Sequence, residues 1–320
     1  MQTCPVAGDK SAFHGGAAKI DRYNALHPFI LLQKPFEIVP AHAEGWGIMR
    51  RLTIDDLDSC IHLAKDRGWP PEAHKWRLLF DIGEPYGIDA PDGDGLAACN
   101  VLTLYGDAHA VISMVLTASR YARRGLGRAL MRHVLDRAGE RTVFLHATEQ
   151  GRPLYEELGF RTTGRVVKHT GVFAGEPSGL TRPATVADLD AILALDAEVF
   201  GMDRSAALRR MFSFGERVRV APGGSGQCRG FGQCWRNDDT IVVGPVVADD
   251  ESTARALIGD LALDPGGEVR MDFDLAHGSM IRWAGEHGMG EPWEVAFMVR
   301  GGDLPGDRSR QFLPFTQALG

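Results

Sequence analysis

The stretch that carries most information about the fold lies at residues 121–130 and reads Tyr121-Ala122-Arg123-Arg124-Gly125-Leu126-Gly127-Arg128-Ala129-Leu130. It follows residues 111–117, an almost unbroken apolar and β-branched run, and leads into residues 126–138, where apolar side chains recur at helical spacing. The first run is typical of a central strand buried on both faces, and the second of an amphipathic helix. The stretch is therefore predicted to be a glycine turn between a buried strand and a helix.

This turn has the chemistry of an anion site. Gly125 and Gly127 let backbone amides approach a ligand closely, and a helix start adds unpaired N–H groups and a partial positive charge. Phosphate or pyrophosphate is the natural ligand. The alternative is a solvated, basic helix start that binds nothing and whose glycines serve only the turn. Leu130 stands where the dinucleotide-binding fingerprint needs a third glycine, so that class is excluded. No Lys-Ser/Thr pair follows the glycines, so the phosphate loop of nucleotide triphosphatases is excluded as well. Four arginines lie in or beside the turn: Arg120, Arg123, Arg124 and Arg128.

The segments on either side of the turn mix strands and helices. Before it we expect a strand from Met49, two helices, and two or three strands; the first helix begins behind Asp55 and Asp56, whose carboxylates suit a helix start. After it, residues 143–146 indicate a strand and residues 151–158 a helix. This order predicts the α/β class, as an α+β mixed sheet with layered helices.

The second half of the chain repeats the plan of the first. Residues 185–190 echo residues 53–58, Arg255-Ala256-Leu257 echoes Arg128-Ala129-Leu130, and His287-Gly288-Met289 stands where Leu158-Gly159-Phe160 stands in the first half. Three matches in one order indicate a duplication. We expect domains at 49–172 and 181–320, joined where Gly, Pro and Ser accumulate near 171–178, and a poorly ordered extension at 1–48.

Composition narrows the class of protein. With 320 residues, 44% of them hydrophobic and 24% charged, the chain is expected to be globular with two domains. A net charge of −7 argues against nucleic-acid binding, and no run approaches the roughly 18 to 20 apolar residues of a membrane span. Five sparse cysteines and no signal peptide predict a reducing, cytoplasmic setting. Cys228 and Cys234 are too widely spaced for a zinc knuckle, so no metal is expected.

Two blocks, residues 114–131 and Thr148-Glu149-Gln150-Gly151-Arg152-Pro153-Leu154-Tyr155-Glu156-Glu157-Leu158-Gly159-Phe160, resemble the GCN5-related N-acetyltransferase (GNAT) superfamily. Ala122 departs from the Gln or Arg that usually opens the family's loop, and Thr148 from its usual Asn. The resemblance implies two tandem acyl-CoA N-acyltransferase domains, with acetyl-CoA as the acyl-donor cosubstrate and its pyrophosphate on the loop amides. The coenzyme-binding residues that it implies are Val115, Leu116, Thr117, Arg123, Arg124, Gly125, Leu126, Gly127, Arg128, Ala129, Thr148 and Gly151.

Acyl transfer to an amine also requires proton transfer. An alkyl amine has a pKa near 10.4 and must lose a proton, whereas the departing thiolate, whose conjugate acid has a pKa near 8.5, gains one. Tyr155 is predicted to be the general acid, although its helix would also place it as a packing residue beside Leu154 and Leu158. The resemblance implies an oxyanion donor in a strand bulge near 114–116. The base stays open between three residues: His146, Glu149 and Glu84.

The second half lacks the features of this site. Asp249-Asp250-Glu251 would repel a pyrophosphate, Pro245 has no amide to donate, and no phenol stands near Trp283-Ala284. Residues 181–320 are therefore expected to form a degenerate GNAT-like domain. Its expected role is to shape the acceptor pocket or to stabilise the first domain.

The predicted function is acetyl-CoA-dependent N-acetyl transfer to a small primary amine, by direct transfer without a covalent intermediate. The alternative is a non-catalytic acyl-CoA-binding sensor or scaffold that uses the same loop. No nucleic-acid or membrane partner is expected. The acceptor stays open between an amino acid, a polyamine, an aminoglycoside and a protein lysine, and the oligomeric state is not predicted.

Overall fold

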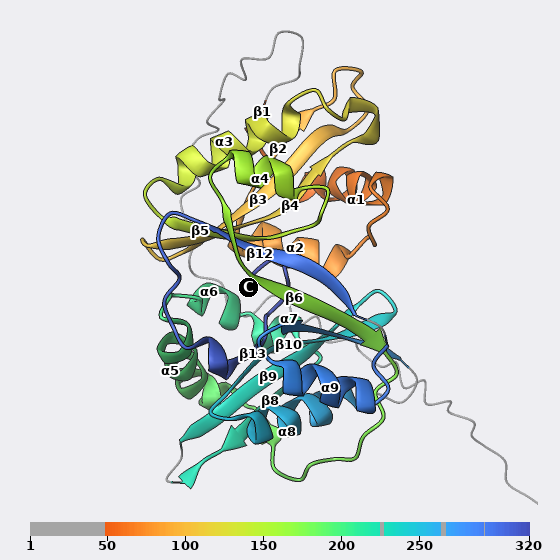
Figure 1. Ribbon diagram of the computed structural model, residues 1–320. Helices are drawn as coiled ribbons and strands as arrows, with labels where there is room; N and C mark the ends of the chain where they lie inside the picture. Colours follow the sequence, from red (N-terminus) through yellow and green to blue (C-terminus); the bar gives the residue numbers. More distant parts are fainter. Residues whose placement is uncertain (1–48, 225–226, 264–266, 291) are drawn as a thin grey trace, which may run out of the picture. The chain divides into compact units, whose positions relative to one another are not determined.

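The computed structural model describes residues 49–224, 227–263, 267–290 and 292–320 (Figure 1). The extension expected at 1–48 lies outside the described residues. The strands are β1 (Met49–Arg51), β2 (Glu84–Asp89), β3 (Leu96–Tyr105), β4 (His109–Thr117), β5 (Thr142–Ala147), β6 (Arg161–Gly171), β7 (Arg182–Pro183), β8 (Arg217–Pro222), β9 (Cys228–Asn237), β10 (Thr240–Ala248), β11 (Glu268–Asp274), β12 (Trp293–Arg300) and β13 (Gln311–Leu313).

The helices follow the predicted alternation with the strands. Residues 126–138, expected as a helix, form α3. Glu84, one of the candidate bases, begins β2, where its backbone pairs with β3. The α-helices are α1 (Leu57–Asp66), α2 (Ala73–Ile82), α3 (Leu126–Ala138), α4 (Arg152–Glu157), α5 (Leu189–Phe200), α6 (Ser205–Leu208), α7 (Met211–Phe214), α8 (Glu251–Ala262) and α9 (Gly278–Glu286). Among the described helices, none is long and apolar enough to cross a membrane.

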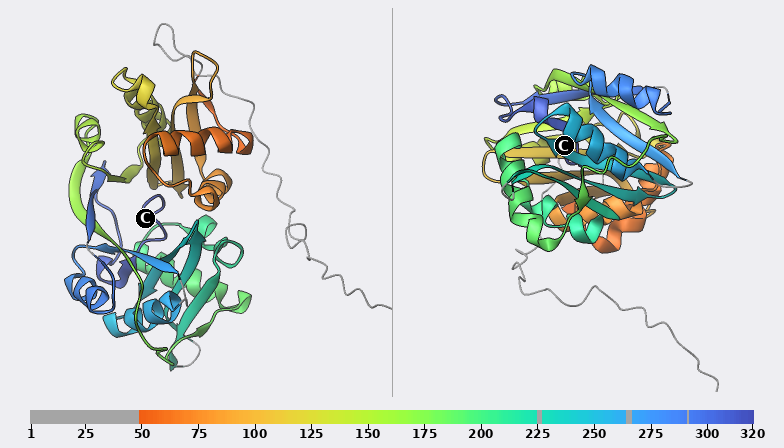
Figure 2. Two further views of the ribbon diagram at one scale, coloured as in Figure 1. Left: turned by 90° about the vertical axis from the view of Figure 1, so that its right-hand side faces the viewer. Right: turned by 90° about the horizontal axis from the view of Figure 1, so that it is seen from below.

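One mixed sheet runs through both halves of the described chain. Its strand order is β1-β2-β3-β4-β5-β12-β6-β11-β10-β9-β8-β7, with β13 paired to β10. Strand β12, from the second half, lies between β5 and β6 of the first, and β6 pairs with β11 of the second (Figures 1 and 2). Because an unpaired backbone group is costly, each half completes the hydrogen bonding of the other.

The repeated sequence forms repeated structure. The backbone N–H of Thr53 donates to the Asp56 carboxylate at 2.9 Å, and that of Thr185 donates to Asp188 at 2.8 Å, so both halves open a helix in the same way. The two carboxylates also each hold an arginine, Arg50 at 2.7 Å and Arg182 at 2.6 Å. The duplication predicted from the sequence is therefore visible in the fold.

An arginine and an aspartate form a buried ion pair within the second half. The Arg204 guanidinium lies 2.8 Å from the Asp196 carboxylate, and both side chains are almost fully buried, at 2% and 1% exposure. Arg204 also donates to the main-chain oxygen of Gly320 at 2.7 Å. A buried charge that lost its partner would be left without compensation.

We expect Asp196→Asn to lower the free energy of unfolding by about 3–5 kcal/mol, because it leaves the Arg204 charge buried and unbalanced. The measurement is urea denaturation of the full chain. The matched control is Glu294→Gln, which breaks the half-exposed pair with Arg165 and should cost less than about 1 kcal/mol. Equal effects of the two substitutions would contradict the prediction.

Candidate active site

Strands β4 and β5 pair only at their beginnings. The register of this parallel pair ends at Val111 opposite Phe144. Beyond that point β4 continues to Thr117 and β5 to Ala147 without further pairing between them. Val115, Leu116 and Thr117, predicted to bind the coenzyme, all lie on the part of β4 that does not pair with β5, with Leu116 buried and the other two half-buried.

A bulge interrupts β4 in the same region. Val101 of β3 pairs with Ser113, whereas Cys99 pairs with Leu116, so two β4 residues stand opposite Asn100. One of them, Met114, has a φ of +52°. Such a bulge redirects backbone groups out of the strand ladder. The bulge expected near 114–116 is therefore present, beside the opening between β4 and β5.

The glycine turn forms an uncapped helix start. Arg123 and Gly125 have φ values of +60° and +83°, and Gly125 is the N-cap of α3. The first bond of the helix runs from Ala129 N–H to the Gly125 carbonyl, so the preceding amides, those of Leu126, Gly127 and Arg128, have no acceptor within the helix. A Cβ at Gly125 would meet no atom within 4 Å. This open, amide-rich position has the chemistry of an anion site.

The arginines near the turn differ in their surroundings. Arg120 lies within 3.5 Å of both Asp92 and Asp94, and Arg128 is bonded to Glu157. Arg124 lies over the Tyr121 ring, with its guanidinium carbon 5.7 Å from the ring centre, and Arg123 is exposed. An anion at this helix start would therefore interact more with the backbone amides than with the side chain of Arg128, whose charge Glu157 already balances.

Helix α3 begins in close contact with β4 and α4. A Cβ on Gly127 would lie 3.4 Å from the Thr117 hydroxyl and 3.6 Å from the Leu154 side chain. The glycine thus allows the helix start, the end of β4 and the helix that carries Tyr155 to approach one another. Three separate predicted segments meet at this point.

Tyr155 is buried on α4. Its side chain packs edge-on against Phe160, with ring centres 6.1 Å apart, and burial raises the pKa of its phenol above the usual value. A Cβ on Gly151 would lie 3.0 Å from the Tyr155 ring, so Gly151 packs against this ring. Thr148 accepts a hydrogen bond from the Gly151 amide at 3.3 Å and so helps to begin α4. The phenol stays protonated well above pH 7.

The three candidate bases have different environments. Glu84 accepts hydrogen bonds from Arg137 and Tyr86. Burial acts to raise the pKa of Glu84, but these bonds hold that pKa below its usual value. Glu149 is exposed and pairs with Arg152 at 3.2 Å. His146 is half-buried on β5, with its Nδ1 2.7 Å from the Gln317 carbonyl oxygen. Cys99 is buried, and contact with Cys60 together with burial raises the pKa of its thiol, as expected for an inert packed cysteine.

Comparisons with known proteins agree on one family. Two family models, both described as an acetyltransferase (GNAT) domain, match residues 192–313 and 101–174. The chain is 27% identical over 277 residues to the "uncharacterized N-acetyltransferase YitH" of Bacillus subtilis (strain 168), covering 84% of this chain and 97% of that protein. The chain belongs to the GNAT superfamily as a tandem N-acetyltransferase.

Solved structures share the fold of this tandem GNAT chain. A Pyrococcus horikoshii protein matches with a TM-score of 0.75 at 19% identity, covering 88% of this chain and 98% of its own. A GCN5-related N-acetyltransferase from Sphaerobacter thermophilus has a TM-score of 0.58 at 18% identity, covering 84% and 99%. A tandem GNAT protein from the clavulanic acid biosynthesis pathway has a TM-score of 0.57 at 16% identity, covering 80% and 99%.

The second GNAT half has the equivalent strand opening, but its own chain fills it. Strands β10 and β11 pair in parallel only as far as Val243 opposite Met271. Beyond that point β13 pairs with β10 instead, with Leu313 opposite Val246. The fit is close, because a Cβ on Gly244 would overlap the Pro314 carbonyl oxygen. Phe312 and Leu313 are buried there.

The helix start of the second GNAT half is capped by the protein itself. Asp250 accepts a hydrogen bond from the Thr253 amide at 2.8 Å at the beginning of α8. Bonds from Ser252 and from the Thr253 amide lower the pKa of Asp250 to about 2, so a carboxylate occupies the position at which α3 has only Gly125. Across the described residues, no group of three or more His, Cys, Asp or Glu side chains could hold a metal ion.

Sequence reasoning missed the contributions of the chain's last residues. The Gln317 carbonyl contacts His146 across 171 positions, and the Tyr105 hydroxyl donates to the Leu319 carbonyl at 2.5 Å. Backbone carbonyls carry no residue-specific signal, so no motif could have indicated these contacts. The filling of the second opening by β13 was missed for the same reason.

We expect Gly244→Ala to destabilise the chain by about 1–3 kcal/mol, because the added methyl group would overlap the Pro314 carbonyl and force β13 away. Gly259→Ala is the matched control: its Cβ would meet no neighbour within 4 Å, and alanine in the helix α8 should stabilise by about 0.5–1 kcal/mol. Thermal and urea unfolding of both variants would measure the difference. A change of the same sign in the free energy of unfolding of both variants would refute the tight fit of β13.

Proposed function

We propose that the first GNAT half transfers the acetyl group of acetyl-CoA directly to a primary amine, with Tyr155 as the general acid. The observation that carries the proposal is the meeting of three features: the uncapped start of α3, the bulged opening between β4 and β5, and the buried phenol on α4. The helix start would bind the anionic part of the coenzyme, the opening would hold its thioester arm, and the phenol would supply the proton for the departing sulfur.

The residues present fit the coenzyme. The amides of Leu126, Gly127 and Arg128 would hold its pyrophosphate, and the left-handed backbone at Arg123 and Gly125 turns the loop around that position. Arg123 and Arg124 would add positive charge. Val115, Leu116 and Thr117 would line the thioester arm of the coenzyme along the part of β4 that does not pair with β5, with Ala129, Thr148 and Gly151 shaping the surrounding contacts.

Each catalytic task has a candidate group on this chain. Acetyl-CoA supplies an activated acetyl thioester. The backbone amides at the bulge near Met114 would stabilise the negative charge that develops on the carbonyl oxygen. Tyr155 would donate its proton to the departing sulfur, and its raised pKa keeps that proton available throughout the physiological range.

We also infer that residues 181–320 form a degenerate domain that does not bind the coenzyme. The acid cap at Asp250 and the β13 segment occupy the two positions that correspond to the anion site and the arm. This supports one coenzyme site for each chain. On this basis we propose domains at 49–172 and 181–320, with β12 as the strand that the second domain contributes to the sheet of the first.

We expect Gly125→Asp to weaken acetyl-CoA binding by at least about tenfold, because its carboxylate would stand where the pyrophosphate binds. Titration calorimetry of the full chain should give one site for the wild type. The matched control is Gly139→Asp at the other end of α3, since both glycines have positive φ and open space around the added Cβ. Binding that survives in Gly125→Asp, or two sites in the wild type, would refute the assignment.

We expect Tyr155→Phe to lower kcat by about 10²–10⁴-fold while acetyl-CoA binding stays unchanged, because only the proton donor is removed. In the wild type the raised pKa of Tyr155 keeps its phenol protonated as the pH rises to 10. Deprotonation of Tyr155 should therefore cause no fall in rate below that pH. Steady-state rates of coenzyme A thiol release measure both effects.

Tyr86→Phe is the control for this variant, because Tyr86 is also a buried tyrosine but bonds to Glu84 on β2. Unchanged turnover in Tyr155→Phe would remove the tyrosine from the acid role. Acetyl-CoA binding without turnover of any amine by the wild type would instead favour the non-catalytic sensor.

A further inference from the structure

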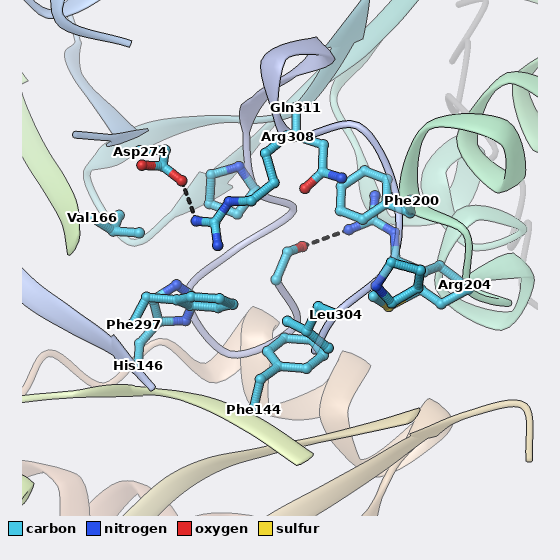
Figure 3. Close-up of a pocket in the computed structure, with 14 residues that line it drawn as sticks. Phe144, His146, Val166, Phe200, Arg204, Asp274, Phe297, Leu304, Arg308 and Gln311 are labelled. Atoms are coloured by element: carbon cyan, nitrogen blue, oxygen red, sulfur yellow. Dashed lines mark hydrogen bonds and ion pairs between the residues drawn. The ribbon is translucent and has the colours of Figure 1, made fainter. Parts of the chain in front are cut away.

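A pocket lies between the two GNAT halves, on the side of β5 that faces the second half. It encloses about 650 Å³, including its mouth. Figure 3 shows Phe297 and His146 on one side of it and Phe200 and Arg204 on the other, with Phe144 and Leu304 between them. Both halves therefore build its wall, and neither half encloses it alone.

The pocket borders the opening between β4 and β5. Phe144 is the last β5 residue paired with β4, and His146 lies two residues further along, on the same face of the strand. Both line the pocket. An acceptor bound there would therefore approach the thioester position from the side of the second half.

His146 has a fixed tautomer. Its Nδ1 lies 2.7 Å from the Gln317 carbonyl oxygen, and because a carbonyl only accepts, Nδ1 carries the hydrogen and Nε2 keeps its lone pair. Burial lowers the pKa of His146 to about 4, so the ring is neutral at pH 7. The charged groups that act on it are Asp272 and Asp274 of β11, which raise its pKa, and Arg308, which lowers it.

The lining is mainly apolar, and its charged side chains are balanced. Asp274 is bonded to Arg308, whose guanidinium also lies 4.8 Å from the centre of the Phe297 ring. Arg204 is paired with Asp196. Among the described residues that line the pocket, Asp274 has the only carboxylate side chain, and Arg308 neutralises it. A polycation would find no uncompensated acidic side chain there.

We propose that this pocket binds the acceptor, a primary amine with an apolar or aromatic body, and that His146 Nε2 is the general base of the transfer. The proposal rests on the proposed function of the first half. The aromatic rings of Phe144, Phe200 and Phe297 would hold the body of the acceptor, and the lone pair of His146 would face its amine. Gln317 acts as a positioning residue through its carbonyl.

The transfer forms one bond and breaks another. The amine nitrogen forms a bond to the acetyl carbon, the carbon–sulfur bond breaks, and its electron pair leaves with sulfur. The extra proton on nitrogen passes to His146 Nε2, and the sulfur takes the proton of Tyr155. The products are an acetamide and the free coenzyme A thiol. Solvent then carries a proton from His146 to Tyr155, which restores the enzyme.

The first test is His146→Asn, which keeps a donor for the Gln317 carbonyl and removes Nε2. With acetyl-CoA and 2-phenylethylamine, we expect kcat to fall by about 10²–10⁴-fold while calorimetric acetyl-CoA binding and the thermal midpoint stay unchanged. The matched control is His169→Asn, because His169 is also a strand histidine, with Nδ1 2.8 Å from the Gly290 carbonyl and a phenylalanine ring beside it. His169 does not line the pocket. Undiminished turnover in His146→Asn, or an equal loss in both variants, would overturn the base assignment.

The second test fills the pocket. Leu304→Trp should raise the KM for 2-phenylethylamine at least about tenfold without changing acetyl-CoA binding, whereas Leu275→Trp, at an exposed leucine outside the lining, should change neither. Spermidine should be the poorer acceptor by kcat/KM. An unchanged KM in Leu304→Trp, or a preference for spermidine, would overturn the pocket as the acceptor site. Absence of acetyl-CoA binding by the wild type would instead refute the proposed function itself.

Discussion

The pairing of β12 with β5 is the constraint on which the candidate site depends. Strand β5 leaves β4 after Phe144, so its later residues would lack backbone partners on both sides without another strand. Strand β12 supplies them, with Met298 opposite Leu145, Phe297 opposite His146 and Ala296 opposite Ala147. Because buried backbone groups must be paired, the opening between β4 and β5 exists only because the second half holds β5 from its other edge.

The same dependence runs in the opposite direction. Strand β11 leaves β10 after Met271, and β6 of the first half holds its other edge, with Phe273 opposite Val167. The duplicated halves thus exchange equivalent strands, and each opening is supported by the partner half. The two openings differ at their ends: the first leads to an uncapped helix start at Gly125, whereas β13 and Asp250 close the second. Duplication created two similar grooves, and a short segment of the chain itself distinguishes them.

This exchange also explains why the pocket between the halves has a mixed wall. Once β12 lies beside β5, the segment after β12 brings Leu304 and Arg308 next to His146 and Phe144. The last residues of the chain then reach the first half, where Gln317 meets His146. The second half therefore contributes to the first whatever it binds itself, because it supplies pocket wall, a paired strand and a hydrogen-bond acceptor.

The sequence by itself determined the local elements and their chemistry. The apolar period at 126–138, the Gly125 turn and the paired helix starts at Thr53 and Thr185 each express a short-range rule, so the elements form where those patterns predict them. Tertiary structure alone decided which strand pairs with β5, that β13 fills the second groove, and that Gln317 orients His146. Those contacts join backbone groups far apart in the chain, and backbone hydrogen-bonding groups are the same in every residue except proline, so no local pattern specifies their partners.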